Sequence, residues 1–168
     1  MIRQFLTRFY VVMSLCGAMM IAMPVTAKAA NAANAVDPVT PDPSIAAVEV
    51  VAIQLKALQF NDNPMENFGI LQTWQFAHPR NRAMTGPLPR FAAMLQSMPY
   101  GTLLNHNSHK ISPTLDTDSV KQFDVLMETQ KGRVLLFQWT VEKVTSGEFA
   151  DCWMTVGVTA PSPAGLGS

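Results

Sequence analysis

The sequence has little cysteine and little charge, and each shortage excludes a class of protein. Only two cysteines occur among the 168 residues, Cys16 and Cys152, too few for a disulfide scaffold and without the Cys/His cluster of a zinc site. Charged side chains form 14% of the chain and the formal net charge is zero, so there is no basic patch to bind nucleic acid. We therefore expect no metal, no cofactor and no nucleic-acid partner. The length suits one domain.

The N-terminus has the three parts of an export signal. Arg3 and Arg8 come before an apolar run, residues 9–23, and Ala-Lys-Ala at 27–29 supplies a cleavage signature. Because the run is shorter than the roughly 20 apolar residues that cross a bilayer, we predict a signal peptide over residues 1–30. An uncleaved anchor, the only membrane contact we expect, is the alternative. Cleavage would leave nine basic and twelve acidic side chains, a net charge of −3.

Composition divides the remaining chain into three parts. Residues 31–42 are small, polar and proline-rich, which predicts a flexible linker. Residues 159–168 predict a disordered tail. Between them, residues 43–158 form a single predicted domain. Cys152 is its only thiol, and we expect the side chain to be buried because it lies in an apolar segment.

The first half of this domain predicts three helices. Asp42-Pro43 begins the first, a capping-box pattern from Asn63 to Glu66 begins the second, and the third fits Leu88–Met98. His78-Pro79 is expected to end the second helix. The predicted buried faces are Val48, Val51, Ala52, Leu55 and Leu58, then Phe68, Leu71 and Trp74, and finally Phe91, Leu95 and Met98.

The second half changes to the two-residue period of half-buried strands. Residues 120–129, 133–144 and 149–158 are predicted strands, and an earlier strand is expected within residues 103–115. The predicted inner face consists of Phe123, Val125, Met127, Leu135, Phe137, Trp139 and Val141. Helices followed by a strand meander predict an α+β domain, in which three N-terminal helices pack on one face of a mostly antiparallel, curved sheet of about four strands.

A set of short motifs resembles an uncharacterised exported bacterial family, domain of unknown function 4864, which also occurs in photosynthetic lineages. The motifs are the stretch from Phe76 to Phe91, Pro99-Tyr100, Leu104-Asn105-His106, Gly132-Arg133-Val134, Trp139, and Asp151 to Thr155. The resemblance spans Ile45 to Val158. It implies a cystatin-like cone fold of the kind typified by nuclear transport factor 2, and it carries no catalytic residue to this chain.

Four basic side chains lie between the second and third predicted helices. His78, Arg80, Arg82 and Arg90 suit a small anion site, because arginine binds carboxylate and phosphate groups. The alternative is that the arginines are solvated loop charges and that His78 caps the end of a helix.

The remaining candidates are histidines and aromatic residues. His106 and His109 lack a third ligand and would face opposite sides of a strand, so we expect no metal site. Tyr100 and Asp124 are the one pair suited to acid–base work, although strand alternation places Asp124 on the solvent face. The tryptophans supply either an aromatic wall for an apolar ligand or core packing, and they are Trp74, Trp139 and Trp153.

These observations favour a non-catalytic ligand-binding or protein-assembly module in the periplasm, or in a thylakoid lumen if the source is photosynthetic. The expected partners are a small apolar or anionic ligand, a second copy of the chain, or an envelope protein. The alternatives are a small lyase or isomerase that uses the cone pocket, and an accessory subunit of an envelope or thylakoid complex. The candidate ligand-binding residues are His78, Arg80, Arg82, Arg90, Tyr100, His106, Trp74 and Trp139.

Overall fold

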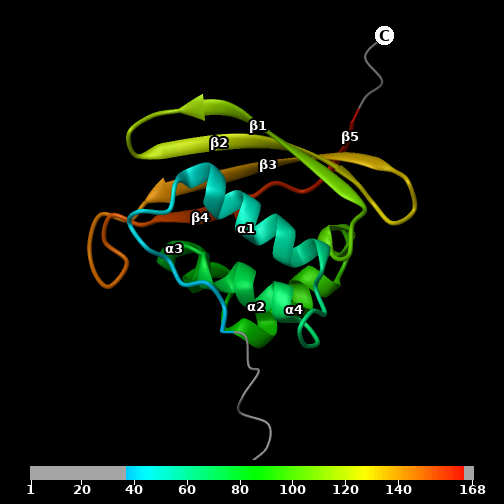
Figure 1. Ribbon diagram of the computed structural model, residues 1–168, viewed down its shortest axis with the longest axis horizontal. Coiled ribbons are helices and arrows are strands. Elements are labelled where there is room, and N and C mark those ends of the chain that lie inside the picture. Colours follow the sequence, from blue (N-terminus) through cyan, green and yellow to red (C-terminus); the bar gives the residue numbers. More distant parts are fainter. Residues whose placement is uncertain (1–36, 165–168) are drawn as a thin grey trace, which may run out of the picture. The chain divides into compact units, whose positions relative to one another are not determined.

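Helices and strands occupy separate halves of the chain, as the sequence predicts (Figure 1). A computed structural model describes residues 37–164. Within these residues the helical half consists of α1 (Ala47–Gln59), α2 (Phe68–Gln75), α3 (Pro79–Thr85), α4 (Leu88–Gln96) and the 3-10 helix η1 (Tyr100–Leu103). The strands that follow are β1 (Ser108–Asp116), β2 (Val120–Glu128), β3 (Val134–Lys143), β4 (Trp153–Val158) and β5 (Ser162–Pro163).

All the strands belong to one antiparallel sheet in the order β1-β2-β3-β4, and β5 pairs with β3 beyond the end of β4. The helices pack on one face of this sheet, which makes the fold α+β (Figure 1). Every residue of the predicted inner face of β2 and β3 is buried, which confirms the two-residue period in both strands. The sheet has five strands because a short fifth strand lies in the segment predicted to be a disordered tail.

Local hydrogen bonds shift the helix starts from their predicted positions. The Asp42 carboxylate accepts from the Ser44 backbone N–H at 2.8 Å and makes a turn, so α1 begins at Ala47 instead of next to Pro43. Likewise Asp62 accepts from the Asn67 N–H at 2.9 Å, and Asn67 has a left-handed φ of 60°. The predicted capping box at Asn63 is therefore wrong, and α2 begins at Phe68.

Helix α3 occupies a segment that was predicted to be a loop. His78 is its N-cap, and the imidazole Nδ1 accepts from the Arg80 backbone N–H at 3.1 Å. Pro79 occupies the first helical position, where proline has no hydrogen bond to lose. The sequence predicts that the His78-Pro79 dipeptide ends the second helix; α2 ends at Gln75, just before it, and Pro79 also starts a further helix.

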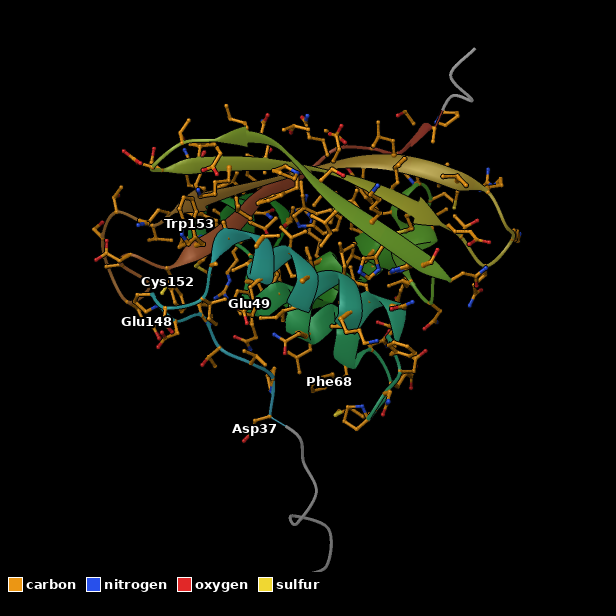
Figure 2. The ribbon with its side chains drawn as sticks, turned by 45° about the horizontal axis from the view of Figure 1, so that its top comes forward. Asp37, Glu49, Phe68, Glu148, Cys152 and Trp153 are labelled. Atoms are coloured by element: carbon orange, nitrogen blue, oxygen red, sulfur yellow. The ribbon has the colours of Figure 1, made fainter. Side chains whose placement is uncertain are left out.

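The shifted starts also rotate the buried faces. Val48 is 47% exposed in α1, and Met98 lies beyond the end of α4 with 71% exposure. In α2 the buried positions are Gly69, Ile70, Gln72 and Thr73, and the predicted face is only half-buried. Phe68 lies on the outer side of the helical layer, away from the sheet (Figure 2).

Parts of the predicted linker and tail are held by hydrogen bonds. Gln72 bonds to both the N–H and the carbonyl of Val39, at 2.7 and 2.8 Å. At the other end, the N–H of Ala164 donates to the carbonyl of Val134. The predicted signal peptide, residues 31–36 of the predicted linker and residues 165–168 of the predicted tail lie outside the described residues. No helix in the described range is long and apolar enough to cross a membrane.

Helix α2 lies close against α1 at Gly69. A β-carbon built there would lie 2.2 Å from the Ala57 carbonyl oxygen, well inside van der Waals contact. The Gly69 N–H also donates to the Asn61 carbonyl at 2.9 Å, which fixes the second helix against the end of the first.

We predict that Gly69→Ala lowers the free energy of unfolding by roughly 1–3 kcal/mol, because the two helices must separate to admit the methyl group. Urea denaturation followed by circular dichroism measures the loss. Gly157→Ala is the matched control, since a β-carbon at Gly157 meets nothing within 4 Å. Equal stability of the two variants would contradict the close packing of α1 against α2.

Candidate functional site

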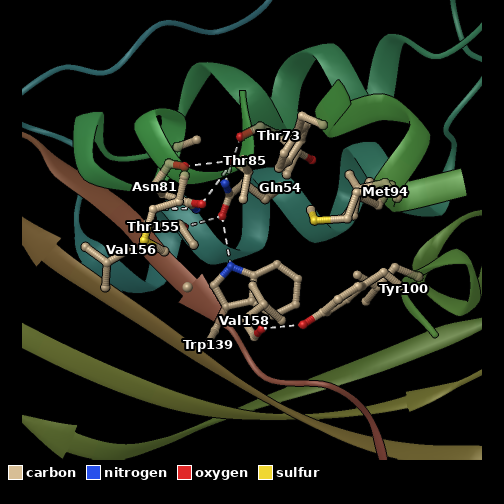
Figure 3. Close-up of a pocket in the computed structure, with 17 residues that line it drawn as sticks. Gln54, Thr73, Asn81, Thr85, Met94, Tyr100, Trp139, Thr155, Val156 and Val158 are labelled. Atoms are coloured by element: carbon tan, nitrogen blue, oxygen red, sulfur yellow. Dashed lines mark hydrogen bonds between the residues drawn. The ribbon is translucent and has the colours of Figure 1, made fainter. Parts of the chain in front are cut away.

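A cavity of about 220 Å³ lies between the helical layer and the inner face of the sheet (Figure 3). Residues of α1 to α4, η1, β3 and β4 all contribute to its wall. Most of the wall is apolar or aromatic: Leu58, Ala77, Met84, Phe91, Met94, Leu95, Tyr100, Leu103, Trp139, Val156 and Val158. Its polar side chains are Gln54, Thr73, Asn81, Thr85 and Thr155, and the backbone of Gly157 completes it.

The buried amide of Gln54 is the centre of the polar part. Its Oε1 accepts from the Trp139 indole N–H at 3.0 Å and from the Thr155 hydroxyl at 2.7 Å. Its Nε2 donates to the Thr73 carbonyl at 3.0 Å. One side chain of α1 thus connects α2, β3 and β4, and four otherwise unpaired buried groups satisfy one another.

Asn81 and Thr85 continue the polar surface on α3. The Asn81 amide donates to the carbonyl of Thr155 at 3.2 Å, and the Thr85 hydroxyl lies 2.8 Å from the Asn81 carbonyl. The N–H of His78 donates to the same Thr155 carbonyl, at 2.9 Å. Strand β4 therefore holds α3 at the edge of the cavity.

Tyr100 supplies a polar group elsewhere in the wall. Its hydroxyl donates to the carbonyl of Val158 at 3.1 Å, and Figure 3 shows the hydroxyl directed toward Val158 beside the Trp139 ring. Of the eight candidate ligand-binding residues, the structure brings only Tyr100 and Trp139 into the cavity wall.

The predicted cluster of basic residues does not converge on one point. Arg80 is exposed and forms an ion pair with Glu142 of β3. Arg82 donates to the carbonyls of Trp74 and Gln75 at 3.0 and 2.8 Å, and its guanidinium lies 5.3 Å from the Trp74 ring centre. Burial lowers the pKa of Arg82.

The other members of that cluster are also accounted for. Arg90 is exposed on α4. His78 lies at the start of a helix and not at the end of one, so the alternative of a cap at a helix C-terminus is wrong. Burial, and then the charge of Arg80, lower its pKa. Trp74 does not line the cavity. Its ring packs against that of Phe91, with ring centres 5.1 Å apart.

The two histidines are hydrogen-bonded to each other, which differs from the expectation that they face opposite sides. His106 precedes β1 and is only 2% exposed, and its Nε2 lies 2.7 Å from His109 Nδ1. His106 Nδ1 lies 2.8 Å from the Leu103 carbonyl, which can only accept. His106 therefore carries its proton on Nδ1, and in the neutral pair His109 donates to His106.

Burial lowers the pKa of both histidines. A hydrogen bond to Leu103 partly offsets this for His106, and the charge of Lys56 lowers the pKa of His109 further. Within residues 37–164 no three His, Cys, Asp or Glu side chains come close enough to hold a metal ion.

Two further sequence expectations concern burial. Cys152 is buried beside Val144, Phe149 and Met154, as expected, and burial raises the pKa of its thiol. Figure 2 shows it where the chain enters β4. Asp124 alternates with buried neighbours and lies on the outer face, so it does not meet Tyr100 in the cavity.

The sequence interpretation missed Gln54, Asn81, Thr85 and Thr155. Gln54 alone carried a signal: it lies three residues after Val51 and four before Leu58, on the apolar stripe of its helix. A polar side chain in such a stripe indicates a buried partner.

Comparisons with known protein families, with curated proteins and with solved structures found no match for this chain. The cavity and its hydrogen bonds are therefore the basis for a function.

We predict that Gln54→Leu lowers the free energy of unfolding by roughly 3 kcal/mol or more, because it leaves the Trp139 indole, the Thr155 hydroxyl and a buried carbonyl without partners. Gln59→Leu, on the same helix, removes one exposed bond to Asn107 and should cost less than about 1 kcal/mol. Chemical denaturation of both variants measures the difference. Similar losses would show that the network contributes little.

We predict that the protein loses stability as the pH falls below about 6.5, the pKa of histidine in an unfolded chain. Below that pH the histidine of the unfolded chain binds a proton, whereas His106 in the folded protein does not, because burial lowers its pKa. Each pH unit therefore lowers the free energy of unfolding by at most about 1.4 kcal/mol for each such histidine, until the pH reaches the pKa in the folded protein. Urea denaturation at pH 8 and pH 5 should show a smaller loss for His106→Gln than for the wild type. Equal losses of stability in the variant and the wild type would contradict the role of His106 in this pH dependence.

Proposed function

We propose that the protein binds a small, mainly apolar molecule in this cavity and that it acts as a binding protein, not as an enzyme. The observation that carries the proposal is the composition of the wall: aromatic and aliphatic side chains surround the space, and a few oriented polar groups face it. Ligand sites in proteins have this composition.

The size of the cavity limits the ligand. About 220 Å³ exceeds the cavity of about 150 Å³ that admits benzene, and it is smaller than the range of about 300–1,000 Å³ typical of drug-sized ligands. A molecule of one ring or two fused rings fits this volume. Two hydrogen bonds hold side chains of the wall in place: the Trp139 indole donates to Gln54, and the Tyr100 hydroxyl donates to the Val158 carbonyl.

The chemistry of the wall supports binding over catalysis. Tyr100 is the one titratable side chain among the residues that line the cavity. A lyase or isomerase needs a positioned acid and base, and Asp124, the partner considered for Tyr100, is on the other face of the sheet.

A second candidate function is assembly through the outer face of the sheet. Leu126 and Val134, on β2 and β3, are 40% and 48% exposed on that face. Such side chains suit contact with a second copy or with an envelope protein. Export to the periplasm or a lumen, and kinship with the domain of unknown function 4864 family, are proposals from the sequence.

Native mass spectrometry of the protein, purified gently from its own cells, tests the binding proposal. We expect a monomer with a reproducible extra mass. Val158→Phe should lose that mass, because Val158 pairs with Trp139 and lines the cavity. Val134→Phe, an exposed valine on the outer face, is the matched control and should keep it.

An empty dimer or a co-purifying subunit would contradict the binding proposal and favour the outer face. Retention of the extra mass in both variants would show that the bound molecule occupies another part of the protein.

A further inference from the structure

We infer that the ligand is an uncharged molecule of one ring or two fused rings, and that it donates a hydrogen bond to the hydroxyl oxygen of Tyr100. The inference rests on the proposed binding function and names the chemical class of the ligand.

The first argument concerns charge. None of the side chains that line the cavity is charged at neutral pH. Arg82, a half-buried cation of the sequence motif, does not line the cavity, and its guanidinium donates to the carbonyls of Trp74 and Gln75. A carboxylate or ammonium ligand would lose its water without gaining an ion pair, which is strongly unfavourable.

The second argument concerns the direction of the hydrogen bond. The Tyr100 O–H is already directed to the Val158 carbonyl at 3.1 Å, across 58 residues of sequence. What the phenol offers a ligand is therefore an oxygen lone pair. A ligand that only accepts would have to draw the proton away from Val158 and leave that carbonyl without its donor.

Tyr100 differs from the other polar groups by its place in the wall. Gln54 Oε1 already accepts two hydrogen bonds, so its lone pairs are occupied. The Thr73 and Thr85 hydroxyls donate to a carbonyl four residues earlier in their own helices, at 2.8 Å, so they too offer a ligand only a lone pair. Tyr100 instead bridges from η1 to β4 and forms, with Trp139, an aromatic part of the wall, against which a ring-shaped ligand packs.

The third argument concerns shape. Trp139, Phe91 and Tyr100 contribute three rings to the wall, and aromatic groups pack against one another in offset or edge-to-face arrangements. A flat ring of the stated size uses such surfaces better than a flexible chain, which loses rotamer freedom when it is confined.

The test uses pairs of ligands of the same shape. p-Cresol has a hydroxyl where p-xylene has a methyl group. 4-Methylbenzoate and 4-methylbenzylammonium carry a negative and a positive charge on a ring of the same size. In NMR titrations of the purified protein we expect p-cresol to bind roughly 3- to 10-fold more tightly than p-xylene, the range of one neutral hydrogen bond. Both charged compounds should fail to bind.

Tyr100→Phe should remove the advantage of p-cresol, so that the variant binds p-cresol and p-xylene equally. Measurable p-xylene binding by the same variant shows that the cavity is kept. Thr102→Val, which removes a nearby exposed hydroxyl of η1 outside the cavity wall, should keep the preference for p-cresol.

Equal binding of p-cresol and p-xylene, a preference that persists in Tyr100→Phe, or binding of a charged compound at this site would overturn the inference. The binding function would survive each of these results. Failure of every neutral compound to bind, together with an empty protein in native mass spectrometry, would refute the proposed function itself.

Discussion

The buried amide of Gln54 is the interaction on which the arrangement of the helical layer over the sheet depends. It lies on α1 and is bonded to the Thr73 backbone of α2, to Trp139 of β3 and to Thr155 of β4. In the low-dielectric interior an unpaired amide or indole N–H is costly, whereas apolar contacts alone tolerate sliding. The network therefore selects one register of α1 and α2 over the sheet, and the same register places the Trp139 ring along the cavity wall.

Strand β4 is irregular where it borders the cavity. The pairing of β3 with β4 shifts between Thr140 and Val141, so that Thr155 and Val158 pair with the inward-facing Val141 and Trp139 while Val156 is the extra residue of a bulge. Thr155 then bonds to Gln54 on one side and to the start of α3 on the other. Because each neighbour is tied to this strand by polar bonds, the helices do not close over the gap as apolar side chains in a uniform core would.

The sequence predicts the sheet well and the helical layer less well, for physical reasons that can be traced to residues. In β2 and β3 the period of two is uninterrupted, and every predicted inward residue is buried. Helix starts depend on which side chain reaches a backbone N–H, and Asp42 and Asp62 form turns where a cap was predicted. The basic cluster has the right composition for an anion site, but Arg80 forms an ion pair with Glu142 and Arg82 donates to backbone carbonyls. The cavity itself is a space between elements, and no local pattern encodes it.

The two sides of the cavity differ in rigidity. Trp139 is 1% exposed and bonded at its indole N–H, so the sheet side keeps a fixed shape. On the helical side the wall includes Met84, which is 69% exposed, and the half-buried Met94, both on short helices. Methionine is unbranched and changes rotamer at little cost. A change of shape on the side of α3 and α4 needs only side-chain movement, whereas a change on the sheet side would break the strand pairing and the Gln54 network. The side of α3 and α4 is therefore the more adaptable one, and the side of β3 and β4 keeps its shape.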